Sequence, residues 1–142
     1  VFAAPSKLET IGMKAFSNCS SLVEIDLHLP HLDLIKEKAF YGCRSLVTVR
    51  LPNSITHIPQ GAFFGCEALQ QFRVGEVLSS IGQCAFHGCG QLQRLVVPAT
   101  CSAIYPDAVP STCAIIRTRA VLHGQAATSE EVEEHENNML VN

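Results

Sequence analysis

The chain has 142 residues, a net charge of −3 and an apolar share of 47% against 16% charged residues. This composition supports a packed core and excludes wholesale disorder. It carries none of the global basic excess that marks nucleic-acid or membrane-surface proteins. No run of about 18 apolar residues is present, so the sequence predicts no transmembrane segment. The seven cysteines form an odd number, which prevents complete internal pairing.

An internal repeat of about 23 residues dominates the sequence. The pair Ala-Phe begins at residues 15, 39, 62 and 85, and a Cys and then a Leu follow each Phe at steps of three residues. A pair of apolar residues two apart comes next, and an Ile opens each unit. The columns are Ile11, Ile35, Ile58, Ile81 and Ile104; Cys19, Cys43, Cys66 and Cys89; Leu22, Leu46, Leu69 and Leu92. Several columns in register over four units exclude a chance match.

The units follow one another along the chain in a regular order. A half unit with Phe2 and Leu8 precedes residue 11, and units start near residues 11, 35, 58, 81 and 104. The last unit is degenerate: Ala108-Val109 replaces Ala-Phe, Cys113 is displaced by one residue, and Thr118 and Ala120 stand at the strand positions. The repeat therefore predicts a domain over residues 1–123, followed by an acidic C-terminal tail over residues 124–142.

Each unit predicts one short strand and one turn. The alternating apolar pair, for example Ile25 and Leu27, is typical of a strand with one face inward. The Ala-Phe-x-x-Cys-x-x-Leu stretch places apolar side chains three residues apart, which favours a short helical or 3₁₀ turn. Neither segment buries its apolar face alone, so the units must stack. The expected architecture is a β-rich solenoid of about five coils, about 25 Å long at a strand spacing of about 4.8 Å.

The L-x-x-I-x-L strand with A-F-x-x-C before it resembles the leucine-rich repeat of the BspA-like, or Treponema pallidum, type. The resemblance covers roughly residues 2–121. It implies a leucine-rich-repeat solenoid of the α/β horseshoe type whose strands line a concave face. Its known members are mostly secreted or cell-surface binding and adhesion proteins, which suggests that localisation here and leaves an organellar or intracellular complex open. The family offers no catalytic residues to carry over.

Arginine gathers in the strand columns that point away from the core. The residues that flank the central strand position are Glu24 and Asp26, Thr48 and Arg50, Gln71 and Arg73, Arg94 and Val96, and Arg117 and Arg119. Five of the six Arg lie in these columns, whereas all four Lys lie outside them. The pattern predicts a basic stripe with an acidic end on the surface that this architecture uses for binding.

The guanidinium group suits bidentate contact with carboxylates, so the stripe indicates an acidic protein partner. The alternative is that the long Arg stems merely cover strand backbone and reach water. The stripe is short and lacks exposed aromatic side chains for base stacking, which argues against nucleic acid.

The tail carries a cluster of acids: Glu130, Glu131, Glu133, Glu134 and Glu136. It is interpreted as a solvating tail, as a short helix covering the last coil, or as a segment that docks on another subunit through Met139, Leu140 and Val141.

The remaining chemistry-bearing residues predict no active site. The Cys column should hold buried, reduced thiols, whereas Cys84 lies in an outward column and is predicted to be the reactive thiol. The six His share no column, and C-x-x-C, phosphate-loop and hydrolase motifs are absent from the sequence. We therefore expect no enzyme activity, no cofactor and no metal.

Three functions fit these observations. The leading hypothesis is a non-catalytic protein-protein interaction module that binds an acidic partner through Arg50, Arg73, Arg94, Arg117 and Arg119, with Glu24 and Asp26 at one end. The second is a structural accessory subunit of a larger multi-subunit complex, held by its coil ends and tail. The third, which rests on the family resemblance alone, is a surface adhesin or antigen fragment.

Overall fold

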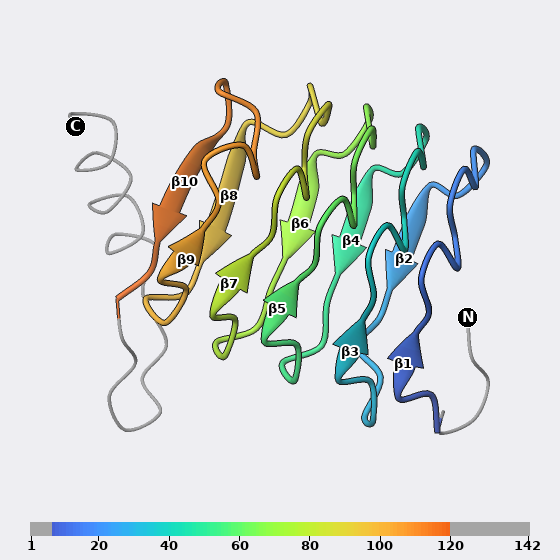
Figure 1. Ribbon diagram of the computed structural model, residues 1–142, viewed down its shortest axis with the longest axis horizontal. Helices are drawn as coiled ribbons and strands as arrows, with labels where there is room; N and C mark the ends of the chain where they lie inside the picture. Colours follow the sequence, from blue (N-terminus) through green and yellow to red (C-terminus); the bar gives the residue numbers. More distant parts are fainter. Residues whose placement is uncertain (1–6, 120–142) are drawn as a thin grey trace.

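A computed structural model describes residues 7–119, which form a β-solenoid of about five coils (Figure 1). Two rows of short parallel strands run side by side along it, and the chain colours progress from blue at β1 and β2 to orange at β9 and β10 (Figure 1). We call these rows the front wall and the back wall. Within residues 7–119 no helix has the length and hydropathy that crossing a membrane requires.

The front wall contains the strands predicted from the alternating apolar pairs. They are β2 (Glu24–Asp26), β4 (Thr48–Arg50), β6 (Gln71–Arg73), β8 (Arg94–Val97) and β10 (Ala114–Arg117). In the parallel register of β2, β4 and β6, Ile25 lies opposite Val49, and Val49 lies opposite Phe72. The spacing of the repeat therefore predicts the register of these three strands correctly.

The back wall contains a second strand in each coil that the sequence analysis did not predict. These strands are β1 (Thr10–Ile11), β3 (Leu34–Ile35), β5 (His57–Ile58), β7 (Ser80–Ile81) and β9 (Ala103–Ile104). Each has two residues, of which the Ile faces the core. Two residues are too few to show an alternating pattern, so hydropathy alone does not reveal these strands.

The Ala-Phe-x-x-Cys-x-x-Leu stretch forms a corner of linked turns, and residues 7–119 contain no helix. Its backbone bonds span three residues, as in a 3₁₀ helix: Cys43 N–H donates to the Phe40 carbonyl at 3.3 Å, and Leu46 N–H donates to the Cys43 carbonyl at 3.2 Å. The corner also bonds to the next coil, since Phe40 N–H donates to the Ala62 carbonyl at 2.8 Å. The expected short helical turns are therefore present only as turns with the hydrogen-bond spacing of a 3₁₀ helix, and the solenoid is a β-solenoid.

Phenylalanine rings stack along the interior. The centroids of Phe16 and Phe40, and those of Phe40 and Phe63, lie 5.1 Å apart with the rings parallel within 2°. Phe63 and Phe86 are farther apart, at 5.6 Å. Phe40, Phe63 and Phe86 are completely buried, so this ladder joins the coils into one hydrophobic core.

The buried Cys column packs beside the ring ladder. The thiols of Cys43, Cys66 and Cys89 donate to the carbonyls of the Phe in the preceding coil at 3.0, 3.3 and 3.1 Å. All seven cysteines are free in the structure, and burial together with the neighbouring Cys66 raises the pKa of Cys43 to about 11. Cys19 departs from the prediction because it is exposed.

The fifth coil departs from the 23-residue spacing. Ala108 keeps the predicted place, since it accepts the Phe86 N–H as Ala85 accepts the Phe63 N–H. The register of β10 on β8, however, places Ile115 opposite Leu95. The prediction that Thr118 holds a strand position was wrong, because the chain between the corner and the strand is shorter than in the other coils. Ala120, the proposed domain boundary at residue 123 and the acidic tail lie outside the described residues.

Candidate binding face

Arg50 and Arg73 lie side by side on the front wall. Arg50 pairs with Arg73 in the register of β4 and β6, and Asp26 pairs with Arg50 in that of β2 and β4. Both Arg side chains are exposed because Val49 and Phe72, one residue earlier in each strand, turn inward. The structure therefore brings together three of the predicted residues in one column, with the carboxylate at one end.

The acidic end of this column is partly engaged within its own coil. The Asp26 carboxylate accepts the backbone N–H of His28 at 3.0 Å. Glu24 lies at the other outward position of β2, opposite Thr48, and is exposed. Both outward positions of β2, the first strand of the front wall, therefore carry carboxylates. No acidic residue lies at the outward positions of β4, β6 or β8.

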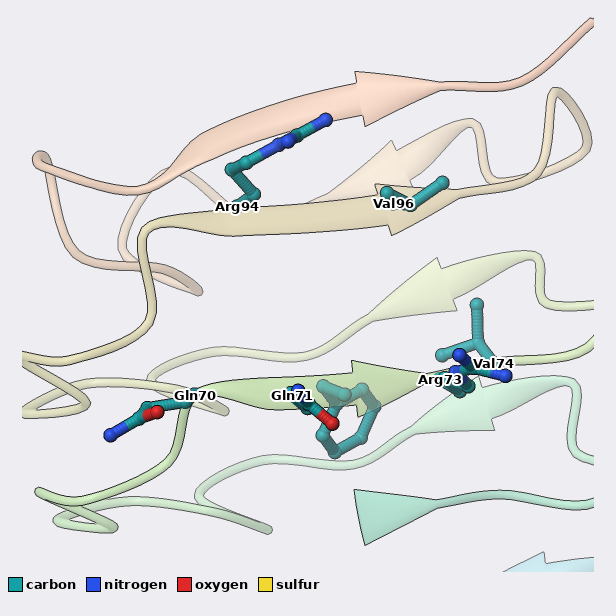
Figure 2. A pocket seen from close by; sticks show the side chains of 7 residues that line it. Gln70, Gln71, Arg73, Val74, Arg94 and Val96 are labelled. Atoms are coloured by element: carbon teal, nitrogen blue, oxygen red, sulfur yellow. The ribbon is translucent and has the colours of Figure 1, made fainter. Parts of the chain in front are cut away.

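Arg94 lies on the next strand but in the other outward column. It opens β8, two residues before the half-buried Val96, and the buried Leu95 separates the two. Its counterpart on β6 by the repeat is Gln71, so Arg94 lies diagonally from Arg73. Figure 2 shows Arg73 at the end of β6 and Arg94 at the start of β8.

Arg117 and Arg119 lie elsewhere than the 23-residue spacing predicts. Arg117 pairs with Val97, not with the Arg94 column, and its guanidinium donates a hydrogen bond to the Cys101 carbonyl. Its side chain is half-buried. Arg119 follows the end of β10 and is exposed. The shortened fifth coil moves both residues by three positions in register, so β8 is the last front-wall strand with an exposed arginine.

A groove opens in the front wall between β6 and β8. β2, β4 and β6 form one sheet and β8 and β10 form another, whereas the turns at the corner join the same coils without a break. The groove has a volume of about 590 Å³. Its lining includes Gln70, Gln71, Arg73, Val74, Arg94 and Val96 (Figure 2).

The side chain of Phe72 accounts for this break. Phe72 takes the strand position that Val49 and Leu95 hold in the neighbouring coils. Its ring meets Phe63 and Phe86 edge-on, at 4.8 Å from each and at 81° and 87°. An inward ring set against both ladder rings occupies more space than an aliphatic side chain, and the Phe63 and Phe86 rings are the widest-spaced pair of the ladder.

The back wall carries a Ser–His contact. The Nδ1 atom of His57 lies 2.5 Å from the Ser80 hydroxyl oxygen, on exposed neighbouring strands. A nucleophilic pair of this kind needs a third group to orient the imidazole, and the hydrogen bonds among the described residues supply none to His57. Over residues 7–119, no group of three or more His, Cys, Asp or Glu is placed to hold a metal ion.

Cys84 lies at the corner and contacts an acid. Its thiol donates to the Asp107 carboxylate at 3.4 Å. Partial burial, the hydrogen bond to Asp107 and the charge of that carboxylate raise the pKa of Cys84. The thiolate is the reactive form, so this environment acts against the expectation that Cys84 is a reactive thiol.

Comparison with known proteins decides the family. The model of the BspA type leucine rich repeat region matches residues 2–115 in six copies. The chain belongs to this family. Leucine-rich repeat proteins of this kind generally act as protein-interaction or surface modules and are typically non-catalytic. Among curated proteins, none matches the chain.

Solved structures of leucine-rich repeat proteins share the fold. A leucine-rich repeat protein from Bacteroides ovatus is 28% identical with a TM-score of 0.70, over 80% of this chain and 29% of that one. The Treponema pallidum leucine-rich repeat protein is 33% identical with a TM-score of 0.65, over 68% and 45%. A leucine-rich cell surface protein from Faecalibacterium prausnitzii is 25% identical with a TM-score of 0.73, over 91% and 33%. The chain spans less than half the length of each of these proteins.

Two features of the site were missed by the sequence analysis. The groove between β6 and β8 and the separate place of Arg117 both depend on how coils meet, which a column of residues does not record. One signal for the groove is nevertheless present, because Phe72 is the aromatic residue among aliphatic ones at the strand centre. The shortened fifth coil also has a signal, since Pro110 and Cys113 interrupt the column spacing.

Proposed function

We propose that this BspA-type repeat is a protein-protein interaction module whose front wall binds an acidic partner. The observation that carries the proposal is the placement of Arg50, Arg73 and Arg94, exposed on three consecutive front-wall strands. Arg119, exposed just past β10, is the outer part of the proposed surface, whereas Arg117 is half-buried and hydrogen-bonded to the Cys101 carbonyl.

Electrostatics favours an anionic ligand at this place. Two exposed cations on adjacent strands repel each other by about 1 kcal/mol in water. A carboxylate bound between Arg50 and Arg73 relieves that repulsion and accepts charge-assisted hydrogen bonds from both. Because Glu24 and Asp26 make the β2 end of the front wall acidic and the arginines make the following strands basic, a partner with a basic residue beside its acidic segment fits in one orientation.

A double charge reversal tests the proposal. The probe is a fluorescein-labelled extended peptide of alternating glutamate and valine, with glutamine in place of glutamate as the neutral control. We expect Arg73→Glu with Arg94→Glu to weaken binding of the acidic peptide at least tenfold, roughly the effect of losing a charged contact. Raising the salt concentration should weaken wild-type binding as well.

The matched control carries the same change in net charge away from the front wall. Lys14→Glu with Lys36→Glu alters a corner residue and a residue after β3. It should bind the peptide as the wild type does, and both variants should keep the wild-type thermal midpoint. Undiminished binding by the arginine variant would contradict the proposed function.

The other two hypotheses, an accessory subunit held by its coil ends and tail and a surface adhesin or antigen fragment, stay predictions. Both are compatible with front-wall binding, since a surface module or a subunit also needs a recognition face. A cell-surface localisation is stated for the relative from Faecalibacterium prausnitzii. For this chain it remains part of the hypothesis.

A further inference from the structure

The junction between β6 and β8 differs from the junction before it. Between β4 and β6, Leu51 N–H donates to the Arg73 carbonyl at 2.9 Å and Gln70 N–H donates to the Val47 carbonyl at 2.9 Å. The same repeat positions on the next junction predict a bond from Val74 N–H to β8. Within residues 7–119 no such bond joins β6 to β8, and the two strands belong to separate sheets.

Between coils three and four the break is confined to the front wall, while the back wall has its own break one junction earlier, between β3 and β5. At the corner, Phe63 N–H donates to the Ala85 carbonyl at 2.8 Å, as in the other coils. On the back wall, β5 and β7 keep their parallel register. Coils three and four are therefore held together on two sides, and the opening between β6 and β8 is a built feature of the wall and not a separation of the coils.

The lining of the groove combines three chemistries in a fixed order. Gln71 supplies an amide near the start of β6, Arg73 a cation at its end, and Val74 with Val96 an apolar contact beside it (Figure 2). Arg94 lines the groove at the start of β8, and its side chain extends from there over β10, on the side away from β6 (Figure 2). An unpaired strand edge with a cation and apolar side chains complements an extended peptide that carries carboxylates and apolar residues in alternation.

We propose that the groove between β6 and β8 is a subsite for one acidic side chain of an extended peptide from a separate protein. The carboxylate enters the groove at Arg73 beside the Gln71 amide, and the neighbouring apolar residue packs on Val74 and Val96. The inference rests on the proposed function and deepens it, because it assigns recognition to the break in the sheet and not to the charge of the whole wall.

The variant Phe72→Leu tests the contribution of the groove to binding without changing any charged residue. Leucine is the residue at the same position of β8, so the variant removes the ring that holds the strands apart and leaves every arginine in place. We expect β6 and β8 to pair, which slows hydrogen exchange of the Val74 amide. Binding of the glutamate–valine peptide should fall about tenfold, the effect of losing one buried contact. Phe40→Leu is the matched control, since it makes the same change in the ladder of coil two and should bind normally.

A second pair of variants avoids the core altogether. Gln71→Glu adds a carboxylate inside the groove, and Thr48→Glu adds one in the same outward column of β4, outside it. The two variants make the same change in net charge, so a general electrostatic effect would weaken peptide binding equally in both. We expect Gln71→Glu to weaken peptide binding at least fivefold more than Thr48→Glu. The reason is that the new carboxylate repels the peptide carboxylate inside the groove.

Each outcome decides the inference. Equal losses in Gln71→Glu and Thr48→Glu, or normal binding by Phe72→Leu together with a slowed Val74 amide, would overturn the subsite while leaving the proposed function standing. Unchanged binding in the double arginine reversal would overturn both. Equal affinity for single-stranded DNA, or self-association of the chain that Gln71→Glu abolishes without any peptide binding, would also overturn it by assigning the groove to another occupant.

Discussion

The first coil and the three coils after it carry the same sequence pattern in different surroundings. Phe16 has the place of Phe40 and Phe63 in the repeat, and Cys19 has that of Cys43. Yet Phe16 is half-buried and Cys19 exposed, whereas their counterparts are completely buried. A side chain in a solenoid is covered by the coil on each side, so its burial depends on both neighbours and not on its own coil.

Surface residues of the first coil show the same difference. Met13 is 60% exposed and Val23 is 54% exposed, whereas Val47, the counterpart of Val23 in the second coil, is half-buried. Among residues 7–119 the ring of Phe16 stacks on Phe40 only, while Phe63 is stacked on both faces and met edge-on by Phe72. Equal residues should therefore contribute unequally to stability, and the following predictions test that difference.

The largest difference is expected for the ladder rings. Phe63→Ala removes a fully buried ring with three aromatic contacts and should lower the free energy of unfolding by about 4 kcal/mol. Phe16→Ala removes a half-buried ring with one such contact and should cost about 2 kcal/mol or less. Urea unfolding followed by circular dichroism measures both. Equal losses would contradict the idea that burial in the solenoid needs two neighbours.

Alkaline pH should act on the buried thiols of the inner coils. Burial raises the pKa of Cys43 and of Cys113 to about 11 from an ordinary value of 9.0. Between these values the unfolded chain has lost protons that the folded chain keeps, so the free energy of unfolding should fall as the pH rises from about 9 to about 11.

Cys43→Ala provides the control for this effect. The variant lacks one of the thiols whose pKa is raised, while its Lys and Tyr side chains are unchanged. Its stability should therefore decline less steeply over the same pH range, as measured by urea unfolding at several pH values. A slope identical to that of the wild type would show that the thiol of Cys43 does not contribute to alkaline destabilisation.

A smaller effect is expected at the left-handed corner position. Lys14 has a φ of 57°, and Gly61 holds the equivalent place two coils later with a φ of 63°. Lys14→Gly should raise the free energy of unfolding by about 1 kcal/mol, because glycine adopts this conformation without steric cost. Lys36→Gly, at a position with negative φ, should lower it by about 0.5 kcal/mol. Thermal unfolding distinguishes the two, and changes of the same sign would refute the conformational argument.

The smallest effect concerns the exposed member of the Cys column. Cys19→Ser should change the free energy of unfolding by less than about 0.5 kcal/mol, because the side chain is at the surface. Cys19 should also be alkylated by iodoacetamide under native conditions before Cys43, Cys66 or Cys89, as peptide mass spectrometry would show. Simultaneous alkylation of the four thiols would mean that the inner coils open as easily as the first.

Much of the architecture follows from the columns of the repeat. The 23-residue spacing predicts the front-wall strands, the inward Phe and Cys columns and the outward arginines of β4, β6 and β8, because side-chain alternation in a strand is a local property. The same spacing predicts that Arg50 and Arg73 are neighbours, as the register of β4 and β6 confirms.

Other features required the tertiary structure. The register of β10 on β8 depends on the length of the shortened fifth coil. This length, and not the 23-residue spacing of the repeat, places Arg117 where it donates a hydrogen bond to the Cys101 carbonyl. The groove depends on the ring of Phe72 between Phe63 and Phe86, and the exposure of Cys19 depends on what lies beside its coil. The sequence by itself determined which residues face inward in each coil. Only the tertiary structure decided how one coil meets the next, because those contacts join residues more than twenty positions apart and depend on packing volume and loop length.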